Sequence, residues 1–319
     1  MGETESKQVV AGVDVASQEL VVCISDNRKI RRFENRAKGL NCLVRELQKR
    51  RVTLVVLEYT GRHERGLLKL LWKAQIPVHC AHPKSVHNFG KVLRANAKSD
   101  PLDALLLAEY GLAVKLAPTK PPAAETLEMQ ELASRRADLN EILVQERNRL
   151  YTPELPAWKR SSMQRHIRYL ERELAAIESR MRQLTEKHDS LARPIATLTE
   201  EYGVGFLTAA TVLAHVPELG KMNRQRVAAL LGLAPFVRTS GKWIGQAKIY
   251  GGRTAARSAL YMAALTVIRK RSHPLRGFYL RLKAANKKTN EALTAVMRKL
   301  AIRLNTRMKA YLNPPAVPA

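Results

Sequence analysis

A short apolar run near the N-terminus constrains the fold most, because it places an acid where a buried strand is expected. Residues 9–15 read Val-Val-Ala-Gly-Val-Asp-Val, a β-rich segment in which Asp14 lies between two valines. A buried carboxylate costs free energy unless it is paired or binds a metal ion. The alternation of side chains along a strand also permits Asp14 to face solvent. The run therefore predicts a core strand whose acid is either a surface residue or a functional one.

The order of the following segments favours an α/β domain over residues 1–117. Two more β-rich runs, 20–25 and 30–33, follow short polar connections and should pair antiparallel with their neighbours. Hydrophobic spacing then predicts helices at 40–49 and 64–73, strands at 53–58 and 77–80, and a further helix from about residue 100. Three β-runs followed by alternating helices and strands is the element order of an RNase H-like fold.

The middle of the chain, residues 118–193, predicts a linker followed by a helical coiled-coil region. Prolines mark the linker at 118–124, and a helix over 125–150 is separated from a second helix by the Pro-containing segment 152–156. The second helix carries apolar residues that alternate by four and three: Met163, Ile167, Leu170, Leu174, Ile177, Met181 and Leu184. This seam predicts an antiparallel hairpin or a dimer arm, with a globular helix pair as the alternative.

The last part, residues 194–311, predicts a mainly α-helical basic C-terminal domain, and 312–319 a short tail. The formal net charge of the chain is +27, and residues 221–319 hold 21 Lys and Arg against the single acid Glu291. A protein this basic usually meets a polyanion, so nucleic acid is the expected partner. A ribosome-associated or merely basic protein is the alternative.

Other sequence features predict a cytoplasmic protein with no membrane segment. No apolar run approaches the roughly 20 residues that cross a bilayer, and the N-terminus lacks an apolar signal region. The three cysteines, Cys23, Cys42 and Cys80, form no CxxC pair and predict no disulfide framework.

Three further acids join Asp14 as candidate metal ligands. Glu58 closes the strand at 53–58, and ligand sites in α/β sheets form at strand ends. Asp100 and Asp103 lie three residues apart at a helix start and face the same way, although simple helix capping is the alternative. Four such carboxylates would repel one another unless divalent cations neutralised them. Two Mg²⁺ ions about 3.5–4 Å apart could clamp the attacking and leaving oxygens of a phosphodiester exchange.

These acids lie in segments that resemble a known signature: Gly12-Val13-Asp14-Val15-Ala16, Leu57-Glu58-Tyr59-Thr60-Gly61 and Lys98-Ser99-Asp100-Pro101-Leu102-Asp103-Ala104. The segments resemble the DEDD motif of transposases of the insertion-sequence family numbered one hundred and ten and of the related Piv-type DNA invertases. The family usually has Thr where Ser99 stands. The resemblance implies a RuvC-like catalytic domain in which Asp14, Glu58, Asp100 and Asp103 hold Mg²⁺.

Two glycine-containing segments in the last third of the chain predict contacts with phosphate groups. Gly203 and Gly205 in Tyr-Gly-Val-Gly resemble a helix-hairpin-helix turn whose backbone amides approach a phosphate, with a tight helix connection as the alternative. The segment 232–257 combines glycines with cations that suit phosphate. The candidate nucleic-acid-binding cations are Lys242, Lys248, Arg253, Arg257, Arg269, Lys270 and Arg271. Ser240 lies in the same segment, and the surrounding residues alone favour its interpretation as a turn residue.

The family resemblance extends to Ser240-Gly241 and implies that Ser240 is a nucleophile that becomes linked to DNA phosphate. It implies a DNA transposase or recombinase that acts on donor and target DNA and is guided by a structured RNA. The coiled-coil pattern itself predicts assembly as a dimer or tetramer. Three alternatives stay open. They are a site-specific DNA invertase, a metal-dependent nuclease or junction resolvase without a covalent intermediate, and a non-enzymatic nucleic-acid-binding protein.

Overall fold

The computed structural model describes residues 8–59, 63–93, 100–235, 239–240, 243–244 and 249–314. The chain divides into two compact units, Met1–Pro121 and Pro122–Ala319. This division falls inside the segment that the sequence predicts as a linker. Within the described residues, no helix combines the length and the apolar character needed to cross a membrane.

The first unit is built on a five-stranded sheet with the order β3-β2-β1-β4-β5. Its strands are β1 Val10–Val15, β2 Glu19–Ile24, β3 Ile30–Glu34, β4 Leu54–Glu58 and β5 Val78–Ala81. Strands β1, β2 and β3 pair antiparallel through short connections, whereas β4 pairs parallel with both β1 and β5. Parallel neighbours require crossover helices. The unit is therefore the mixed α/β domain that the element order predicts.

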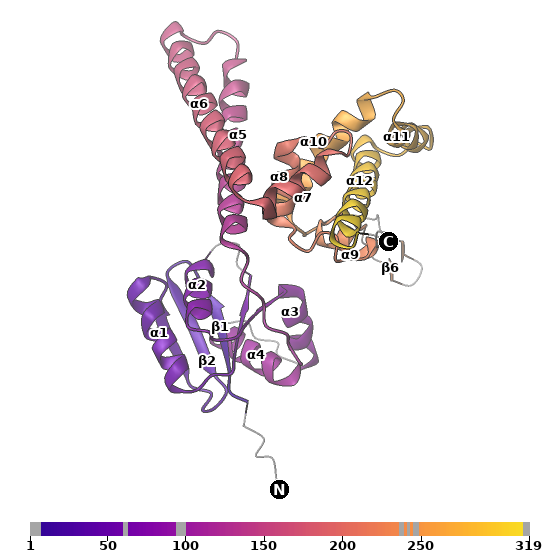
Figure 1. Ribbon diagram of the computed structural model, residues 1–319. Coiled ribbons are helices and arrows are strands. Elements are labelled where there is room, and N and C mark those ends of the chain that lie inside the picture. The colour runs from indigo at the N-terminus through magenta and orange to yellow at the C-terminus, as the bar shows by residue number, and fades with distance from the viewer. Residues whose placement is uncertain are drawn as a thin grey trace. The chain divides into compact units, whose positions relative to one another are not determined.

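Helices cover both faces of this sheet, with α1 and α2 on one face and α3 and α4 on the other (Figure 1). Their bounds are α1 Ala37–Lys49, α2 Arg65–Lys73, α3 Pro83–Val92 and α4 Asp100–Ala113. The sequence prediction missed α3, which buries only Val86 and Gly90. A helix with so small a buried face leaves almost no periodic signal.

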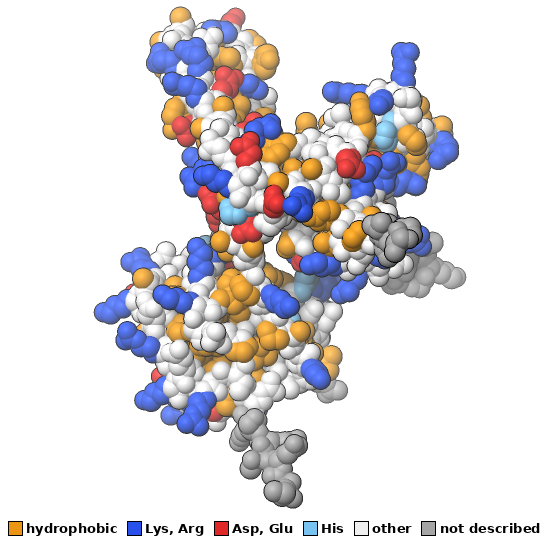
Figure 2. All heavy atoms as spheres, in the orientation of Figure 1, with side chains coloured by type: hydrophobic (Ala, Val, Ile, Leu, Met, Phe, Trp, Pro, Cys, Tyr) orange, Lys and Arg blue, Asp and Glu red, His pale blue; other side chains and the backbone are white. Residues whose placement is uncertain are grey.

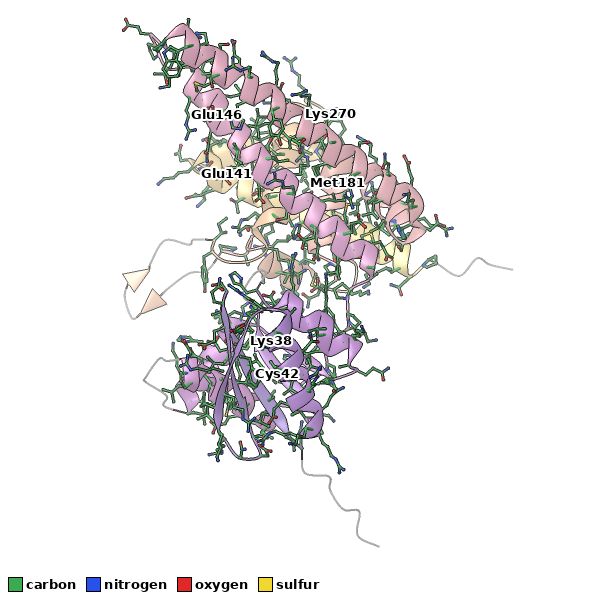
Figure 3. All side chains as sticks on the ribbon, turned by 90° about the vertical axis from the view of Figure 1, so that its left-hand side faces the viewer. Lys38, Cys42, Glu141, Glu146, Met181 and Lys270 are labelled. Atoms are coloured by element: carbon green, nitrogen blue, oxygen red, sulfur yellow. The ribbon has the colours of Figure 1, made fainter. Side chains whose placement is uncertain are left out.

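The second unit begins with an antiparallel hairpin of two long helices, α5 Ala124–Leu150 and α6 Ala157–Lys187. The predicted seam faces inward, and six of its seven residues are buried while Ile177 is partly buried. Acidic and basic side chains are interleaved over its surface (Figure 2). Ion pairs cross between the helices at Arg180–Glu128, Arg136–Glu178 and Arg147–Glu171. Figure 3 shows α5 and α6 side by side, with Glu141 and Glu146 labelled on α5 and Met181 on α6.

The rest of the second unit is a helical bundle that shares its core with the base of the hairpin. Its elements are α7 Asp189–Thr199, α8 Phe206–His215, α9 Arg224–Leu230, β6 Thr239–Ser240, β7 Trp243–Ile244, α10 Thr254–Arg269, α11 Pro274–Ala284 and α12 Thr289–Leu312. Met129 of α5 and Met181 of α6 belong to the same buried cluster as Leu260 and Leu304 of the bundle. The hairpin is therefore rooted in the bundle rather than joined to it by a separate linker.

Candidate active site and nucleic-acid interface

Asp14 and Glu58 lie on neighbouring parallel strands at the same end of the sheet. The register of β1 against β4 runs up to the pair formed by Val13 and Leu57, and each acid is the next residue of its strand. Both side chains are partly buried. The carboxyl ends of parallel strands meet at one edge, which is where ligand sites form in α/β sheets.

The two acids also share one face of the sheet, the face covered by α4. A Cβ on Gly111 of α4 would lie 2.6 Å from a methyl group of Val10 and 2.7 Å from one of Val56. Side chains two or four residues apart on a strand point to the same face. Asp14, four residues after Val10, and Glu58, two residues after Val56, therefore belong to the α4 face.

The N-terminus of α4 brings Asp100 and Asp103 to this same edge. A Cβ on Gly12 would overlap the carbonyl oxygen of Ala104, so helix backbone and strand backbone are in direct contact there. Ala104 follows Asp103 directly, and Gly12 lies two residues before Asp14. Asp103 is partly buried and Asp100 is exposed. Both acids lie in the first turn of α4, where the helix dipole favours negative charge.

Asn35 ties together the two loops that follow the acid-bearing strands. Its side-chain nitrogen donates to the carbonyl oxygen of Ala16 at 2.8 Å and to that of His63 at 3.1 Å. Ala16 lies two residues after Asp14, and His63 lies five residues after Glu58. Asn35 therefore supports the candidate site, although a single Asn after a strand carries no sequence signal of that role.

The donor set fits a hard divalent cation, because carboxylate oxygens are the protein ligands that Mg²⁺ prefers. Across the described part of the chain, however, no three Asp, Glu, His or Cys side chains converge closely enough to hold one ion. The four acids are gathered at one edge without forming an assembled ligand cage.

Ser240 is part of a small β-hairpin in the second unit. Its backbone pairs with that of Trp243, and Thr239 pairs with Ile244. The side chain of Ser240 lies outside what the structure describes, as do Lys242 and Lys248.

Arg253 and Arg257, which the sequence offers as phosphate ligands, have partners within the protein. Arg253 makes a two-fold ion pair with Glu218, from Nη1 to Oε2 at 2.5 Å and from Nη2 to Oε1 at 2.6 Å. Arg257 Nη1 donates to the carbonyl oxygen of Gly251 at 2.5 Å. Burial raises the pKa of Glu218, but the hydrogen bonds and charge of Arg253 outweigh it and hold that pKa below its usual value.

The predicted turn between α7 and α8 contains two glycines with different surroundings. Gly203 has a φ of 86°, and a Cβ there would lie 2.7 Å from Val267 Cγ2 of α10. Gly205 is the N-cap of α8 and has no atom within 4 Å of where its Cβ would be. Gly203 therefore has a conformational and packing reason to be glycine, whereas Gly205 leaves the start of α8 accessible.

Three exposed cations, Arg269, Lys270 and Arg271, lie next to this turn at the end of α10. The ammonium nitrogen of Lys270 lies 4.0 Å from the ring centroid of Tyr202, which borders a depression that also includes Gly205. Among the charged side chains on the visible face of this bundle, Lys and Arg outnumber Asp and Glu (Figure 2). The open start of α8 and three cations with no acid in ion-pair contact among the described residues suit the phosphates of a nucleic acid.

Two family models match the chain. The DEDD model, described as a transposase, matches residues 11–152 and spans all four acids. The second, described as the transposase IS116/IS110/IS902 family, matches residues 196–280 and spans Ser240 and the α7–α8 turn.

Curated relatives match most of the chain. The pilin gene-inverting proteins of Moraxella bovis and Moraxella lacunata are each 24% identical to it over 298 residues, which cover 91% of this chain and 92% of each relative. Among solved structures, RuvC of T. thermophilus in complex with a Holliday junction substrate is 18% identical, covers 35% of this chain and 99% of its own, and gives a TM-score of 0.27. A second Thermus thermophilus RuvC structure is 16% identical and gives a TM-score of 0.26.

Proposed function

The chain belongs to the IS116/IS110/IS902 family of transposases, enzymes that act on DNA, and we propose that it cuts and rejoins strands with a carboxylate metal site and Ser240. One observation carries the proposal. Asp14 and Glu58 end neighbouring parallel strands, and the first turn of α4 brings Asp100 and Asp103 to the same face. Four acids on rigid elements at one edge suit phosphodiester chemistry better than they suit fold stability, since like charges repel.

Asp14, Glu58, Asp100 and Asp103 would hold the cation. When bound, a divalent ion supplies neutralisation of the phosphate charge and polarises the bond under attack. The protein contributes the placement of the acids: Gly12 fixes α4 against β1, and Asn35 fixes the loops after β1 and β4. Fixed backbone positions of this kind limit how far the four acids must move to bind a cation.

Ser240 is the proposed nucleophile. Its hydroxyl oxygen bonds to the phosphorus and gives up its proton, the bond from phosphorus to a deoxyribose oxygen breaks, and that oxygen leaves with a proton. The resulting phosphoserine ester conserves the free energy of the broken bond. A hydroxyl of a second strand then attacks the ester, which joins the strands and releases the serine.

The proposed partners are DNA, a structured RNA and further copies of the chain. Donor and target DNA bind the basic bundle, with Arg269, Lys270, Arg271 and the open start of α8 as contacts, and a structured guide RNA shares this positive surface. The hairpin acts as a coiled-coil arm that assembles a dimer or tetramer. Exposed apolar side chains on its outer surface support that role: Ile142, Val144 and Tyr169.

Site-specific inversion is a second candidate function. It is favoured by the relatives named as pilin gene-inverting proteins, which match nearly the whole chain. The strand chemistry would be the same, and only the arrangement of DNA sites would differ.

The test is to incubate the full chain with its flanking DNA, Mg²⁺ and the adjacent transcript, and to score joined strands and trapped protein–DNA adducts. We expect Asp14→Asn and Ser240→Ala to abolish both products. Thr239→Ala, which removes the neighbouring hydroxyl of β6, and Asp26→Asn, which alters an acid at the opposite end of the sheet, should leave both intact. Joining that persists in Ser240→Ala would refute the serine role, and cleavage without any adduct would favour a plain nuclease.

A further inference from the structure

Gly232, two residues after α9, and Gly252, two residues before α10, flank the segment that carries Ser240, and the two glycines are in contact. A Cβ on Gly252 would overlap the backbone nitrogen of Gly232 and lie 2.7 Å from its Cα. Gly232 and Gly252 have φ values of 64° and 72°, which side chains rarely adopt. Backbone atoms of Gly252 and Gly232 therefore touch directly, and the Arg257 guanidinium packs beside them, so a Cβ on either glycine would disturb the contact.

Side-chain contacts of Arg253 also hold Gly232 and Gly252 together. The ion pair between Arg253 and Glu218 joins the N-cap of α10 to the turn after α8, and Arg253 Nη1 also donates to the carbonyl oxygen of His215 at 2.6 Å. The backbone nitrogen of Arg253 donates to the carbonyl oxygen of Leu230 at 3.0 Å, at the end of α9. We call the set of Gly232, Gly252, Arg253 and Glu218 the neck.

The guanidinium of Arg253 is committed to these partners. It uses both terminal nitrogens on the carboxylate of Glu218, in the paired geometry that makes Arg–carboxylate contacts strong and directional. A phosphate would have to compete with Glu218 for both terminal nitrogens. The neck is therefore suited to holding the protein's own chain, and not to binding DNA.

We propose that the neck positions Ser240 for attack by fixing both ends of the segment that carries it. This inference rests on the proposed role of Ser240 as nucleophile. The neck residues touch the loop ends and not the reacting atoms, so their effect passes through the chain. A loop whose ends are fixed samples fewer arrangements, and a nucleophile displaced by about 1 Å can lose on the order of a hundredfold in rate.

The sharpest test compares two neighbouring glycines. Gly251 and Gly252 have nearly the same left-handed backbone, with φ of 65° and 72°, but a Cβ on Gly251 meets nothing within 4 Å. Gly251→Ala therefore reproduces the backbone strain without opening the neck. We expect Gly252→Ala to slow adduct formation by about tenfold or more relative to Gly251→Ala, because it displaces the loop. Affinity for DNA, measured by mobility shift, should be the same in both.

A second pair of variants tests the ion pair and guards against misfolding of Gly252→Ala. Arg253→Lys and Glu218→Gln each remove the two-fold contact, and the double variant should be no slower than the worse single one. Arg50→Lys is the control, since Arg50 pairs with Asp26 at the amino end of β1, away from the acids. A readout without catalysis is trypsin cleavage after Arg238, Lys242 or Lys248, which should be faster in the neck variants at a temperature far below unfolding.

The outcomes separate the inference from the function on which it rests. Equal rates in Gly252→Ala and Gly251→Ala, with Arg253→Lys and Glu218→Gln like wild type, would overturn the positioning role while Ser240→Ala still abolished adducts. Loss of DNA affinity in parallel with rate would also overturn it, because Arg253 would then be a DNA ligand. Full joining by Ser240→Ala would instead refute the serine itself.

Discussion

Individual glycines allow close backbone contacts in both units, beside the candidate acids and beside the segment that carries Ser240. Gly12 lets α4 touch β1 and brings Asp103 toward Asp14, and Gly252 lets the two ends of the Ser240 segment meet. In both cases the neighbour is backbone, which cannot move aside as a side chain can. A single methyl group at either position must therefore shift a whole element.

We predict that Gly12→Ala weakens both the first unit and its activity. The added Cβ overlaps the carbonyl oxygen of Ala104, so α4 must move away from β1 and take Asp100 and Asp103 with it. The expected cost is about 1–3 kcal/mol in the free energy of unfolding, measured by urea titration, with loss of strand joining. Gly66→Ala is the control, because its Cβ meets only the end of the Leu40 side chain, at 3.1 Å. Equal stability of the two variants would contradict the prediction.

At the scale of helices and strands, prediction from sequence succeeds where the signal is local. Alternating apolar residues indicate the strands, and the spacing of four and three indicates the buried seam of α6. The inward direction of Asp14 and Glu58 depends on strand register, which a sequence does not state. It follows here from the pairing of β1 with β4 and from the contact with α4.

The roles of polar side chains were harder to predict, because their partners are distant in sequence. Arg253 and Arg257 look like phosphate ligands in a basic segment, yet Arg253 pairs with Glu218, 35 residues away. Asn35 bridges two loops that belong to different strands. A charge or an amide in a sequence does not reveal what it contacts, so the contacts of Arg253 and Asn35 became visible only in the fold.

We predict that the stability of the hairpin depends on the buried residues between α5 and α6 and not on its outer surface. Leu170 is 2% exposed and Tyr169 beside it is 50% exposed. Leu170→Ala should lower the free energy of unfolding by about 2–4 kcal/mol, because it leaves a cavity between α5 and α6. Tyr169→Ala should leave that free energy nearly unchanged, because the side chain it removes is half exposed. Comparable unfolding of both variants would argue against the observed seam.

For the whole molecule, charge decides how binding responds to salt. The net charge of +27 is concentrated in the second unit, whose last 99 residues contain one acid. Lys and Arg that contact phosphates release counterions, so affinity falls as salt rises. The exposed cations at the end of α10 are the natural place for such contacts, because they have no acid in ion-pair contact among the described residues.

We predict that replacing Arg269, Lys270 and Arg271 by Gln lowers the salt dependence of DNA binding. The slope of log affinity against log salt should shrink by about 0.9 for each phosphate contact removed, measured by fluorescence anisotropy at several ionic strengths. Arg50→Gln, which changes a cation already paired with Asp26 and Glu46, should leave the slope as it was. An unaltered slope in the triple variant would move the interface elsewhere on the bundle.

The path of the chain through α5 and α6 has a consequence for how such proteins can vary in size. The chain travels out along α5 and returns along α6, and the residues at the root, such as Glu128 and Arg180, are opposite one another. Deleting one heptad from each of α5 and α6, at positions that face each other, would shorten the hairpin by about 10 Å, at 1.5 Å per residue. The contact between Glu128 and Arg180 would be preserved. The hairpin could thus be lengthened or shortened by matched changes in α5 and α6, while the helical bundle at its base kept its geometry.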